Sequence, residues 1–299
     1  MRDRIKIIVN PVSGRGRALR LAESVAALLR RQGCSVDLQL TQKGGDARIF
    51  AAESAGFSAL AATGGDGTVN EVLNGLPVDA APALAMLPSG TANVFAKELR
   101  LPRSADGLAR MLREGREVSW DLGIERIGGR KFLLFASAGY DAHVVHVFHA
   151  SRTGPIQMWQ YIYWGIKSIL HFEIPRITVE VDGARVTTEA AWVTISNVPS
   201  YGGPLVFTPR ARPDNKTFEV MIQHARKRRD IVRMFWAAIL GWMGVPYAMH
   251  DVTFHTARKV RLSSTDGRPV PLQMDGDPAG GLPAELDVVP GGIRVLTPK

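Results

Sequence analysis

The run Gly64-Gly65-Asp66-Gly67-Thr68 stands between a short apolar stretch, residues 58–63, and a segment with a helical pattern, residues 68–76. Glycine at such a junction lets the backbone turn sharply and approach a ligand closely. The helix that follows presents free N–H groups and the positive end of its dipole, which suits a phosphate. Asp66 adds a carboxylate, which suits a metal ion carried on that phosphate. The alternative interpretation is a tight strand-to-helix turn with a solvated aspartate, because glycine-rich turns are common.

The part of the chain before residue 120 alternates between strand and helix patterns. Strands are predicted at 5–9, 35–40, 58–63 and 83–87, and helices at 17–32, 46–55, 68–76 and from about residues 91 and 105. Such alternation with short loops predicts an α/β domain whose parallel sheet is covered on both faces. Ligands bind at the carboxyl ends of the strands in such sheets. Three loops are expected there: residues 10–14, 64–68 and 88–93.

The pattern changes after Trp120. Gly128-Gly129 and Asp182-Gly183 each separate two strand-like runs and predict hairpin turns. Further strand-like runs predict a β-rich antiparallel second domain, interrupted by helices around 155–171 and 229–243. We therefore expect an α/β domain over residues 1–120 and a β-rich domain over 121–299, whose last segment can return to the first domain.

The formal net charge of +9 implies attraction to an anionic partner. The basic residues are dispersed and form no recognition-helix signature, so we expect no nucleic-acid partner. Cys34 is the single cysteine, which excludes an intramolecular disulfide and fits a reducing compartment. The N-terminus shows no signal-peptide pattern, and no apolar stretch is long enough for a membrane span. We expect a cytoplasmic protein that is soluble or peripheral to the inner face of the membrane.

Several further motifs accompany the Gly64–Thr68 run in a fixed order. They are Asn10-Pro11-Val12-Ser13-Gly14, Thr41 before Gly45-Asp46-Ala47, Asn70-Glu71, Pro88-Ser89-Gly90-Thr91-Ala92-Asn93, Tyr201-Gly202-Gly203-Pro204 and Gln273-Met274-Asp275-Gly276-Asp277-Pro278. Together they resemble the bacterial lipid kinases of the diacylglycerol kinase and sphingosine kinase-like superfamily, over essentially the whole chain. The Gly-Gly-Asp-Gly-Thr motif alone is shared with NAD kinases, whereas the ordered combination is more specific.

The resemblance implies that the domain over residues 1–120 binds the nucleotide and that the domain over 121–299 binds the lipid. It also implies an active site in the cleft between the two domains, with ATP and Mg²⁺ as cofactors. The residues that match nucleotide contacts are Asn10, Ser13, Gly14, Thr41, Gly65, Asp66, Gly67, Thr68, Asn70, Glu71, Gly90, Thr91 and Asn93. Mg²⁺ near Asp66 and backbone N–H groups would neutralise charge on the transferred phosphoryl group. No Gly-x-x-x-x-Gly-Lys-Ser/Thr sequence is present, so a Walker-type loop is not expected.

The family carries its presumed general base at the last position of an Asp-Gly-Glu motif, where this chain has Asp275-Gly276-Asp277. The resemblance therefore implies that Asp277 is the base, and that Asp275 orients Asp277 or the metal. Aspartate is one methylene shorter than glutamate, so the loop must compensate or the base must act through a water. The alternative is a plain Asp-Gly hairpin turn. The resemblance also implies a structural Mg²⁺ site at Asp214. The family often has Asp-Asp-Gly here, whereas this chain has Asp214-Asn215-Lys216, so the sequence leaves open whether the site exists.

Two segments have the composition of a membrane-facing surface. Residues 156–164 are dense in aromatic side chains, and the basic run 226–229 precedes an apolar segment, 231–236. Each is equally explained as a core helix. His143, His146 and His149 recur every three residues without a metal-binding spacing, and we interpret them as packing or surface residues.

The sequence thus predicts an ATP-dependent lipid kinase of phospholipid metabolism, which phosphorylates a hydroxyl of a lipid such as diacylglycerol or a sphingoid base. The alternatives are a soluble kinase similar to NAD kinases, and a non-catalytic nucleotide-sensing protein that binds membranes. The expected partners are a lipid alcohol and an anionic membrane surface. Sequence alone identifies neither the lipid nor whether the protein forms a homodimer.

Overall fold

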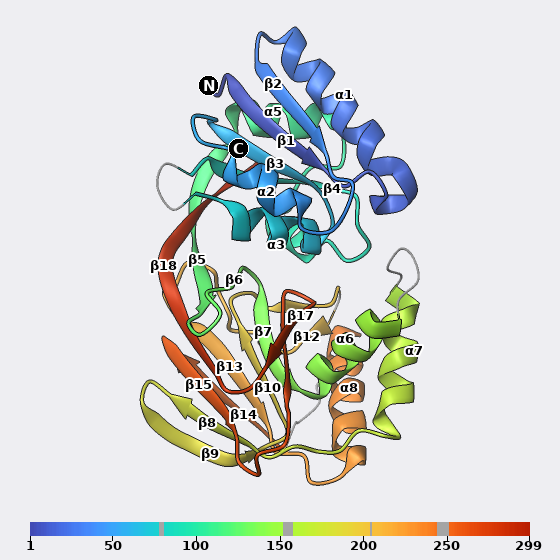
Figure 1. The fold of residues 1–299 in the computed structure, drawn as a ribbon, viewed down its shortest axis with the longest axis vertical. Coiled ribbons are helices and arrows are strands. Elements are labelled where there is room, and N and C mark those ends of the chain that lie inside the picture. The colour runs from blue at the N-terminus through green and yellow to red at the C-terminus, as the bar shows by residue number, and fades with distance from the viewer. Residues whose placement is uncertain (78–80, 152–157, 204, 244–250) are drawn as a thin grey trace. The chain divides into compact units, whose positions relative to one another are not determined.

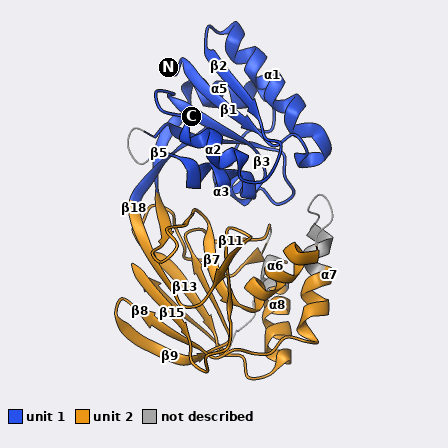
Figure 2. Cartoon of the chain, in the orientation of Figure 1, with its two compact units in different colours: residues 1–120, 291–299 blue, residues 121–290 orange. Residues whose placement is uncertain are grey.

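The computed structural model describes residues 1–77, 81–151, 158–203, 205–243 and 251–299 (Figure 1). The chain forms two compact units (Figure 2). Unit 1 comprises residues 1–120 and 291–299, and unit 2 comprises residues 121–290. Two long strands, β5 (Arg116–Glu125) and β18 (Ala284–Thr297), pair with each other and each contribute residues to both units.

Unit 1 is an α/β domain. Its elements are β1 (Arg4–Val9), the 3₁₀ turn η1 (Ser13–Gly16), α1 (Arg17–Arg31), β2 (Ser35–Leu40), α2 (Asp46–Ala52), β3 (Ala59–Gly64), α3 (Asp66–Gly75), β4 (Ala83–Pro88), α4 (Val94–Glu98) and α5 (Ala105–Glu114). The strands lie in the order β2-β1-β3-β4 and all neighbouring pairs are parallel. The end of β18 adds a further parallel strand beside β4, where Val295 pairs with Leu84.

The strands of unit 1 are apolar on both faces because helices cover both. On one face, alternate residues of β1, β3 and β4 pack against the buried stripes of α1 and α5 in one cluster that includes Ile7, Ala61 and Leu29. Helices α2 and α3 pack closely against each other. The Cβ of any other residue at Gly75 would meet the Arg48 backbone, so glycine permits this packing.

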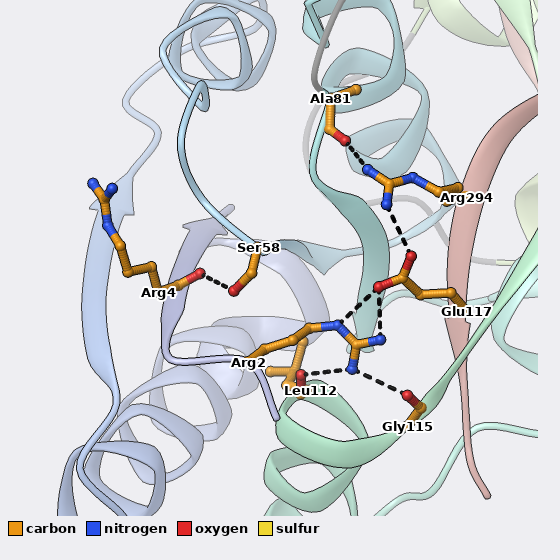
Figure 3. Close-up of polar contacts among 8 residues, drawn as sticks. All are labelled: Arg2, Arg4, Ser58, Ala81, Leu112, Gly115, Glu117 and Arg294. Atoms are coloured by element: carbon orange, nitrogen blue, oxygen red, sulfur yellow. Dashed lines mark hydrogen bonds and ion pairs between the residues drawn. The ribbon is translucent and has the colours of Figure 1, made fainter.

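Within unit 1, Glu117 binds two arginines that lie near opposite ends of the chain (Figure 3). Its carboxylate accepts hydrogen bonds from Arg2 Nη2 at 2.9 Å and from Arg294 Nη1 at 3.0 Å. Arg294 Nη2 also donates to the carbonyl of Ala81 at 2.6 Å, and Arg2 Nη1 to that of Gly115 at 3.0 Å. These bonds connect the N-terminus, β5 and β18 within this unit.

Unit 2 has two main antiparallel sheets, one short two-stranded sheet and, within its described residues, three helices. Its elements are β6 (Lys131–Phe132), β7 (Phe135–Gly139), α6 (Tyr140–Ser151), α7 (Met158–Ile169), β8 (Ile177–Val181), β9 (Ala184–Ala190), β10 (Trp192–Ser196), β11 (Ser200–Tyr201), β12 (Leu205–Val206), β13 (Phe218–Gln223), α8 (Arg228–Trp242), β14 (Val252–Ala257), β15 (Lys259–Ser264), β16 (Pro271–Met274) and β17 (Asp277–Gly281). One sheet has the order β18-β15-β8-β9, and the other β14-β13-β10-β7-β16-β17.

The two sheets of unit 2 enclose one hydrophobic core. Alternate residues of both sheets meet there, including Val179 and Leu262 of one sheet and Val193 and Val220 of the other. This arrangement is a β-sandwich. The opposite face of the six-stranded sheet carries Trp192 and packs in a second cluster with residues of α6, α7 and α8. Figure 1 shows these three helices grouped beside that sheet.

The α/β first domain and the antiparallel second domain that the sequence predicts are both confirmed. Some element boundaries differ from the prediction. Helix α3 begins at Asp66 rather than residue 68, and α4 begins only at Val94, because Asn93 has a left-handed backbone with φ of 47°. Among the described residues, no helix has the length and apolar character needed to cross a bilayer.

Candidate active site

Three loops of unit 1 converge beyond the carboxyl ends of β1, β3 and β4. The Asn10 N–H donates to the Thr63 carbonyl at 2.9 Å, which joins the first loop to the end of β3. The N–H groups of Ser89 and Gly90 both donate to the Gly64 carbonyl, at 3.0 and 3.1 Å. The Ser89 hydroxyl donates to the Ser13 hydroxyl at 3.2 Å. The structure therefore brings together the three loops that the sequence predicts at this edge.

Glycine is required where these loops touch. A Cβ on Gly90 would lie 2.5 Å from the Gly65 Cα, and a Cβ on Gly14 would overlap the Ser89 carbonyl oxygen. Gly14 also has a positive φ of 59°, which side chains disfavour. The glycines thus allow three backbones to approach directly, and such backbones can present N–H groups to an anion.

The Asp66 carboxylate holds the third loop in place. One oxygen accepts a hydrogen bond from the Val94 N–H and the other from the Phe95 N–H, both at 3.0 Å. Desolvation raises the pKa of the Asp66 carboxyl, and the two backbone donors oppose that shift. Asp66 therefore links the start of α3 to the start of α4, a role that the sequence did not reveal.

The other candidate nucleotide contacts of unit 1 are placed around this edge. The Thr41 N–H donates to the Val9 carbonyl at 2.9 Å, which sets Thr41 directly after β2. Glu71 reaches across to the neighbouring loop, since its Oε2 accepts from the Gly45 N–H at 3.0 Å. Asn93 Nδ2 donates to the Gly90 carbonyl at 2.9 Å, while Thr91 is exposed in the same loop.

Helix α3 carries the remaining members of the predicted set. Gly67 and Thr68 lie in its first turn, and the Thr68 N–H donates to the Gly65 carbonyl at 3.0 Å. Asn70 is buried, and its Oδ1 accepts from Asn74 Nδ2 at 3.2 Å. The Asn70 side chain thus contacts the next turn of α3.

In unit 2, Asp275 and Gly276 form a two-residue turn between β16 and β17. Both have positive φ, 51° and 87°, as a type I′ hairpin turn requires. The Asp275 side chain is buried, and its carboxylate accepts from three consecutive backbone N–H groups. These are Leu133 at 2.8 Å, Leu134 at 2.8 Å and Phe135 at 3.1 Å. The carboxylate therefore fixes this turn to the strand entering β7.

Asp277 is the first residue of β17 and remains partly exposed. Its carboxylate oxygens lie 3.7 Å from Arg130 Nη2 and 3.7 Å from His149 Nε2. Arg130 Nη1 also donates to the Pro278 carbonyl at 2.6 Å, which holds the guanidinium beside the strand. The sequence did not select Arg130, and it assigned His149 to packing or surface. Nothing in their spacing would have linked them to Asp277.

A buried polar network lies behind the turn. The carboxylate of Asp141, near the start of α6, accepts hydrogen bonds from Ser137 Oγ, Tyr201 Oη and Gln273 Nε2. The other end of the Gln273 amide accepts from the Gly276 N–H at 2.9 Å. Burial raises the pKa of the Asp141 carboxyl, although these hydrogen bonds oppose the shift. The network thus couples the Asp275–Asp277 turn to the Tyr201 motif, whose Pro204 lies outside the described residues.

The acidic side chains of the described residues do not form a complete metal site. Within the described parts of the chain, no group of three or more His, Cys, Asp or Glu side chains could hold an ion. Asp214 is exposed, and the neighbouring Asn215 Oδ1 accepts from the Thr217 N–H at 3.0 Å. Magnesium usually binds proteins through one or two carboxylates together with substrate phosphates. Both oxygens of Asp66 accept from backbone N–H groups, and the described acidic residues form no protein cage for an ion.

Glycine-rich loops at the carboxyl edge of a parallel sheet, beside the start of a helix, are typical of a protein that binds a phosphate-bearing ligand. Two family models match the chain: "Diacylglycerol kinase catalytic domain" over residues 4–124 and "YegS C-terminal NAD kinase beta sandwich-like domain" over residues 135–297. The chain belongs to this diacylglycerol kinase-like family of lipid kinases, and it is an ATP-dependent kinase with an alcohol acceptor.

Curated relatives extend over the whole chain. A diacylglycerol kinase of Staphylococcus carnosus is 28% identical over 302 residues, covering 100% of this chain and 96% of the relative. A diacylglycerol kinase of Bacillus subtilis is 27% identical over 299 residues, covering 99% and 97%. A crystal structure of a diacylglycerol kinase from Bacillus anthracis has a TM-score of 0.73 at 20% identity and covers 99% and 97% of the two chains. That structure shows a shared fold.

Proposed function

We propose that this kinase transfers the γ-phosphoryl group of ATP to the free hydroxyl of diacylglycerol. The observation that carries the proposal is the full-length match to curated relatives named diacylglycerol kinase, which spans both the loops of unit 1 and the Asp275–Asp277 turn. A sphingoid base is the alternative acceptor, because both present a hydroxyl at the end of an apolar body. Both acceptors make the same demand on the protein: one alcohol proton must be removed.

The proposed nucleotide site is the edge where the three loops of unit 1 converge. The N–H groups at the start of α3, a ten-residue helix, suit phosphate oxygens, and the helix dipole adds positive potential. Mg²⁺ bound with ATP would neutralise charge on the phosphates. The proposal gives Asp66 a contact to this ion through the lone pairs that its two backbone donors leave available. In phosphoryl transfer such positioning and neutralisation account for most of the catalysis.

Asp277 is the proposed general base. It is partly exposed at the start of β17, whereas the Asp275 carboxylate is occupied by three backbone donors. Only Asp277 therefore has a carboxylate that is open to solvent at this turn. In the proposed reaction, Asp277 accepts the hydroxyl proton as the alcohol oxygen attacks the γ-phosphorus. Asp275 has the supporting role of holding the turn.

The test is transfer of labelled phosphate from ATP to a panel of acceptors in mixed micelles. The panel contains diacylglycerol, monoacylglycerol, sphingosine, ceramide, phosphatidylglycerol and, as a soluble acceptor, NAD. We expect labelled phosphatidic acid from the wild type, and a loss of 10²-fold or more in rate from Asp277→Asn. Asp277→Glu restores the residue of the family motif and serves as the matched control, which should retain activity. Label on NAD alone, or on no acceptor while ATP still binds, would refute the proposal.

A lipid acceptor also requires access to a bilayer, and we propose that α7 and α8 provide it. Tyr163, Ile166 and Leu170 are exposed at helical spacing on and just after α7, with exposed fractions of 49%, 68% and 65%. On α8, Val232 and Trp236 are exposed four residues apart, directly after the exposed basic run 226–229. Basic and apolar groups together suit an anionic membrane surface. Residues 156 and 157 of the predicted aromatic segment lie outside the described residues.

Vesicle sedimentation tests this surface separately from catalysis. We expect the wild type to bind vesicles containing phosphatidylglycerol more tightly than vesicles of phosphatidylcholine alone. Trp236→Ser should weaken binding to both, and Arg229→Gln only to the anionic vesicles, with the difference shrinking at high salt. Equal binding of wild type and Trp236→Ser would exclude α8 from the contact.

A further inference from the structure

His149 is the histidine of α6 that faces the proposed base. Helix α6 carries three histidines, and the structure gives each a different neighbour. The His143 ring packs against Phe172 with ring centroids 5.2 Å apart, and His146 Nε2 contacts the Leu272 carbonyl at 2.8 Å. His149 Nε2 instead lies 3.7 Å from Asp277 Oδ1. His149 comes from a helix and Asp277 from a strand, and they meet because α6 packs against both β16 and β17.

The pair has a charged neighbour among the described residues. Arg130, from the β5–β6 hairpin, approaches the other oxygen of Asp277 at 3.7 Å. On α6 itself, His146 faces the Leu272 carbonyl, His143 packs against Phe172, and Asp141 lies at the far end of the helix. From the β16–β17 turn, Asp275 is directed into its three backbone donors. From α7, Lys167 lies over the Trp164 ring at 4.9 Å.

Asp277 acting alone as a base would be left as a carboxylic acid after each transfer. That acid needs a group to which it can pass the proton before the next turnover. An imidazole titrates near pH 6.5, so it is suited to receive a proton from a carboxylic acid.

We propose that His149 is a positioning residue that orients the Asp277 carboxylate and receives the proton that Asp277 removes from the lipid hydroxyl. This inference rests on the proposed role of Asp277 as general base. The chain has aspartate where the family motif has glutamate, and a second group beside the shorter side chain compensates for its lower reach and basicity. The 3.7 Å separation closes by a small side-chain movement or through one water, as such contacts commonly do when substrate binds.

The proposed step is balanced without a further reactant. The alcohol O–H bond breaks and its proton moves to an Asp277 oxygen, while the alcohol oxygen forms a bond to the γ-phosphorus. The bond from that phosphorus to the β–γ bridging oxygen breaks, and its electron pair stays on ADP. The proton then moves from Asp277 to neutral His149, which becomes an imidazolium paired with the regenerated carboxylate. His149 releases the proton to solvent before the next turnover.

Steady-state turnover (kcat) of His149→Gln, measured against pH, tests the proposal. We expect kcat to fall roughly 10-fold at neutral pH, less than the 10²–10⁴-fold typical for loss of a direct base, because His149 acts through Asp277. The wild-type rate should also fall as pH drops through the imidazole range, because an already protonated His149 cannot receive the proton. That acid limb should be absent in His149→Gln.

The matched control is His146→Gln, one helical turn away, whose side-chain amide can still donate to the Leu272 carbonyl. It should keep both the rate and the acid limb. An unchanged rate in His149→Gln would overturn the proposal. A reduced rate with the acid limb intact would also overturn it, because it would assign His149 a purely structural role.

A measurement without turnover separates this inference from the proposed function. The imidazole proton signals of the seven histidines are followed by NMR titration, with His149→Gln identifying the His149 signal. Asp277→Asn removes the negative partner, so the His149 midpoint should fall by about 0.5–1 pH unit. An unchanged midpoint would overturn the pairing itself. A shifted midpoint in a wild type that phosphorylates no lipid would refute the proposed function and, with it, the relay.

Discussion

Substituting Asp275 with alanine or asparagine tests whether this residue has a structural or a catalytic role. Its buried carboxylate accepts from the N–H groups of Leu133, Leu134 and Phe135. Alanine would leave all three donors without this acceptor. Asparagine tolerates the left-handed backbone at this position, φ of 51°, and keeps one acceptor oxygen. The two variants therefore remove different numbers of hydrogen bonds from the same turn.

The expected costs follow from those numbers. In Asp275→Asn the amide oxygen can still accept from the N–H groups of Leu134 and Phe135, and the amide NH₂ opposes the N–H of Leu133. One hydrogen bond to a charged group is lost, about 1.5–3 kcal/mol. In Asp275→Ala three buried donors lose their partner, and the cost should reach roughly 3–5 kcal/mol. For a unit of this size each kcal/mol lowers Tm by roughly 2–4 °C.

Thermal unfolding followed by circular dichroism measures both variants. Asp182 offers a matched control, because it also precedes glycine, has a φ of 49° and accepts from the N–H groups of Arg258 and Lys259, but it is exposed. Asp182→Ala should cost far less than Asp275→Ala, since water replaces the lost acceptor. A loss below about 1 kcal/mol in Asp275→Ala would refute the reasoning. If folded Asp275→Asn lost all kinase activity, Asp275 would have a direct role in the reaction.

Two further variants test unit 1. Gly90→Ala places a Cβ 2.5 Å from the Gly65 Cα, so we expect at least a tenfold loss of ATP affinity by calorimetry, whereas Gly44→Ala, with open space at its Cβ, should bind normally. For Glu117, desolvation raises the pKa, but the hydrogen bonds and charges of Arg2 and Arg294 outweigh it and hold the pKa below its usual 4.5. Its contribution is therefore present above pH 4.5 and is lost as pH falls through the lower folded pKa. We expect Glu117→Gln to cost under about 1 kcal/mol at pH 7, because the pair is partly exposed, and to match wild type at acid pH in urea unfolding.

The α/β unit of the fold could be predicted from the sequence because its signals are local. Each strand, loop and helix of unit 1 follows the previous one directly, so the Gly64–Thr68 run and the loops after β1 and β4 could be located from composition alone. Strand β18 could not be predicted in this way. Its middle contains Pro290 and Gly291, which usually end a strand, yet it runs from Ala284 to Thr297 because tertiary pairing outweighs local propensity.

The neighbours of the site residues could not be predicted, because the fold brings them from distant segments. No spacing rule connects Arg130, His149 and Asp277, which come from a hairpin, a helix and a strand. The Asp-Gly pair at 275–276 was open to two interpretations, a hairpin turn or a catalytic motif. The structure shows that the hairpin is real, and that the residue after the pair is the one whose carboxylate meets basic side chains.

Asp66, Asp275 and Asp277, from the two glycine-containing motifs, differ in what their carboxylate oxygens contact. This difference predicts different roles for them. Both oxygens of Asp66 accept from backbone N–H groups, as do both oxygens of Asp275. A carboxylate that accepts hydrogen bonds from the backbone fixes the conformation of a loop. Its removal should therefore mainly lower the stability of the fold or change the shape of the site. The Asp277 oxygens face two side chains that carry protons, Arg130 and His149. Of the three carboxylates, only that of Asp277 lies beside a side chain able to exchange a proton, His149. Substitution of Asp277 should therefore change turnover most and stability least of the three.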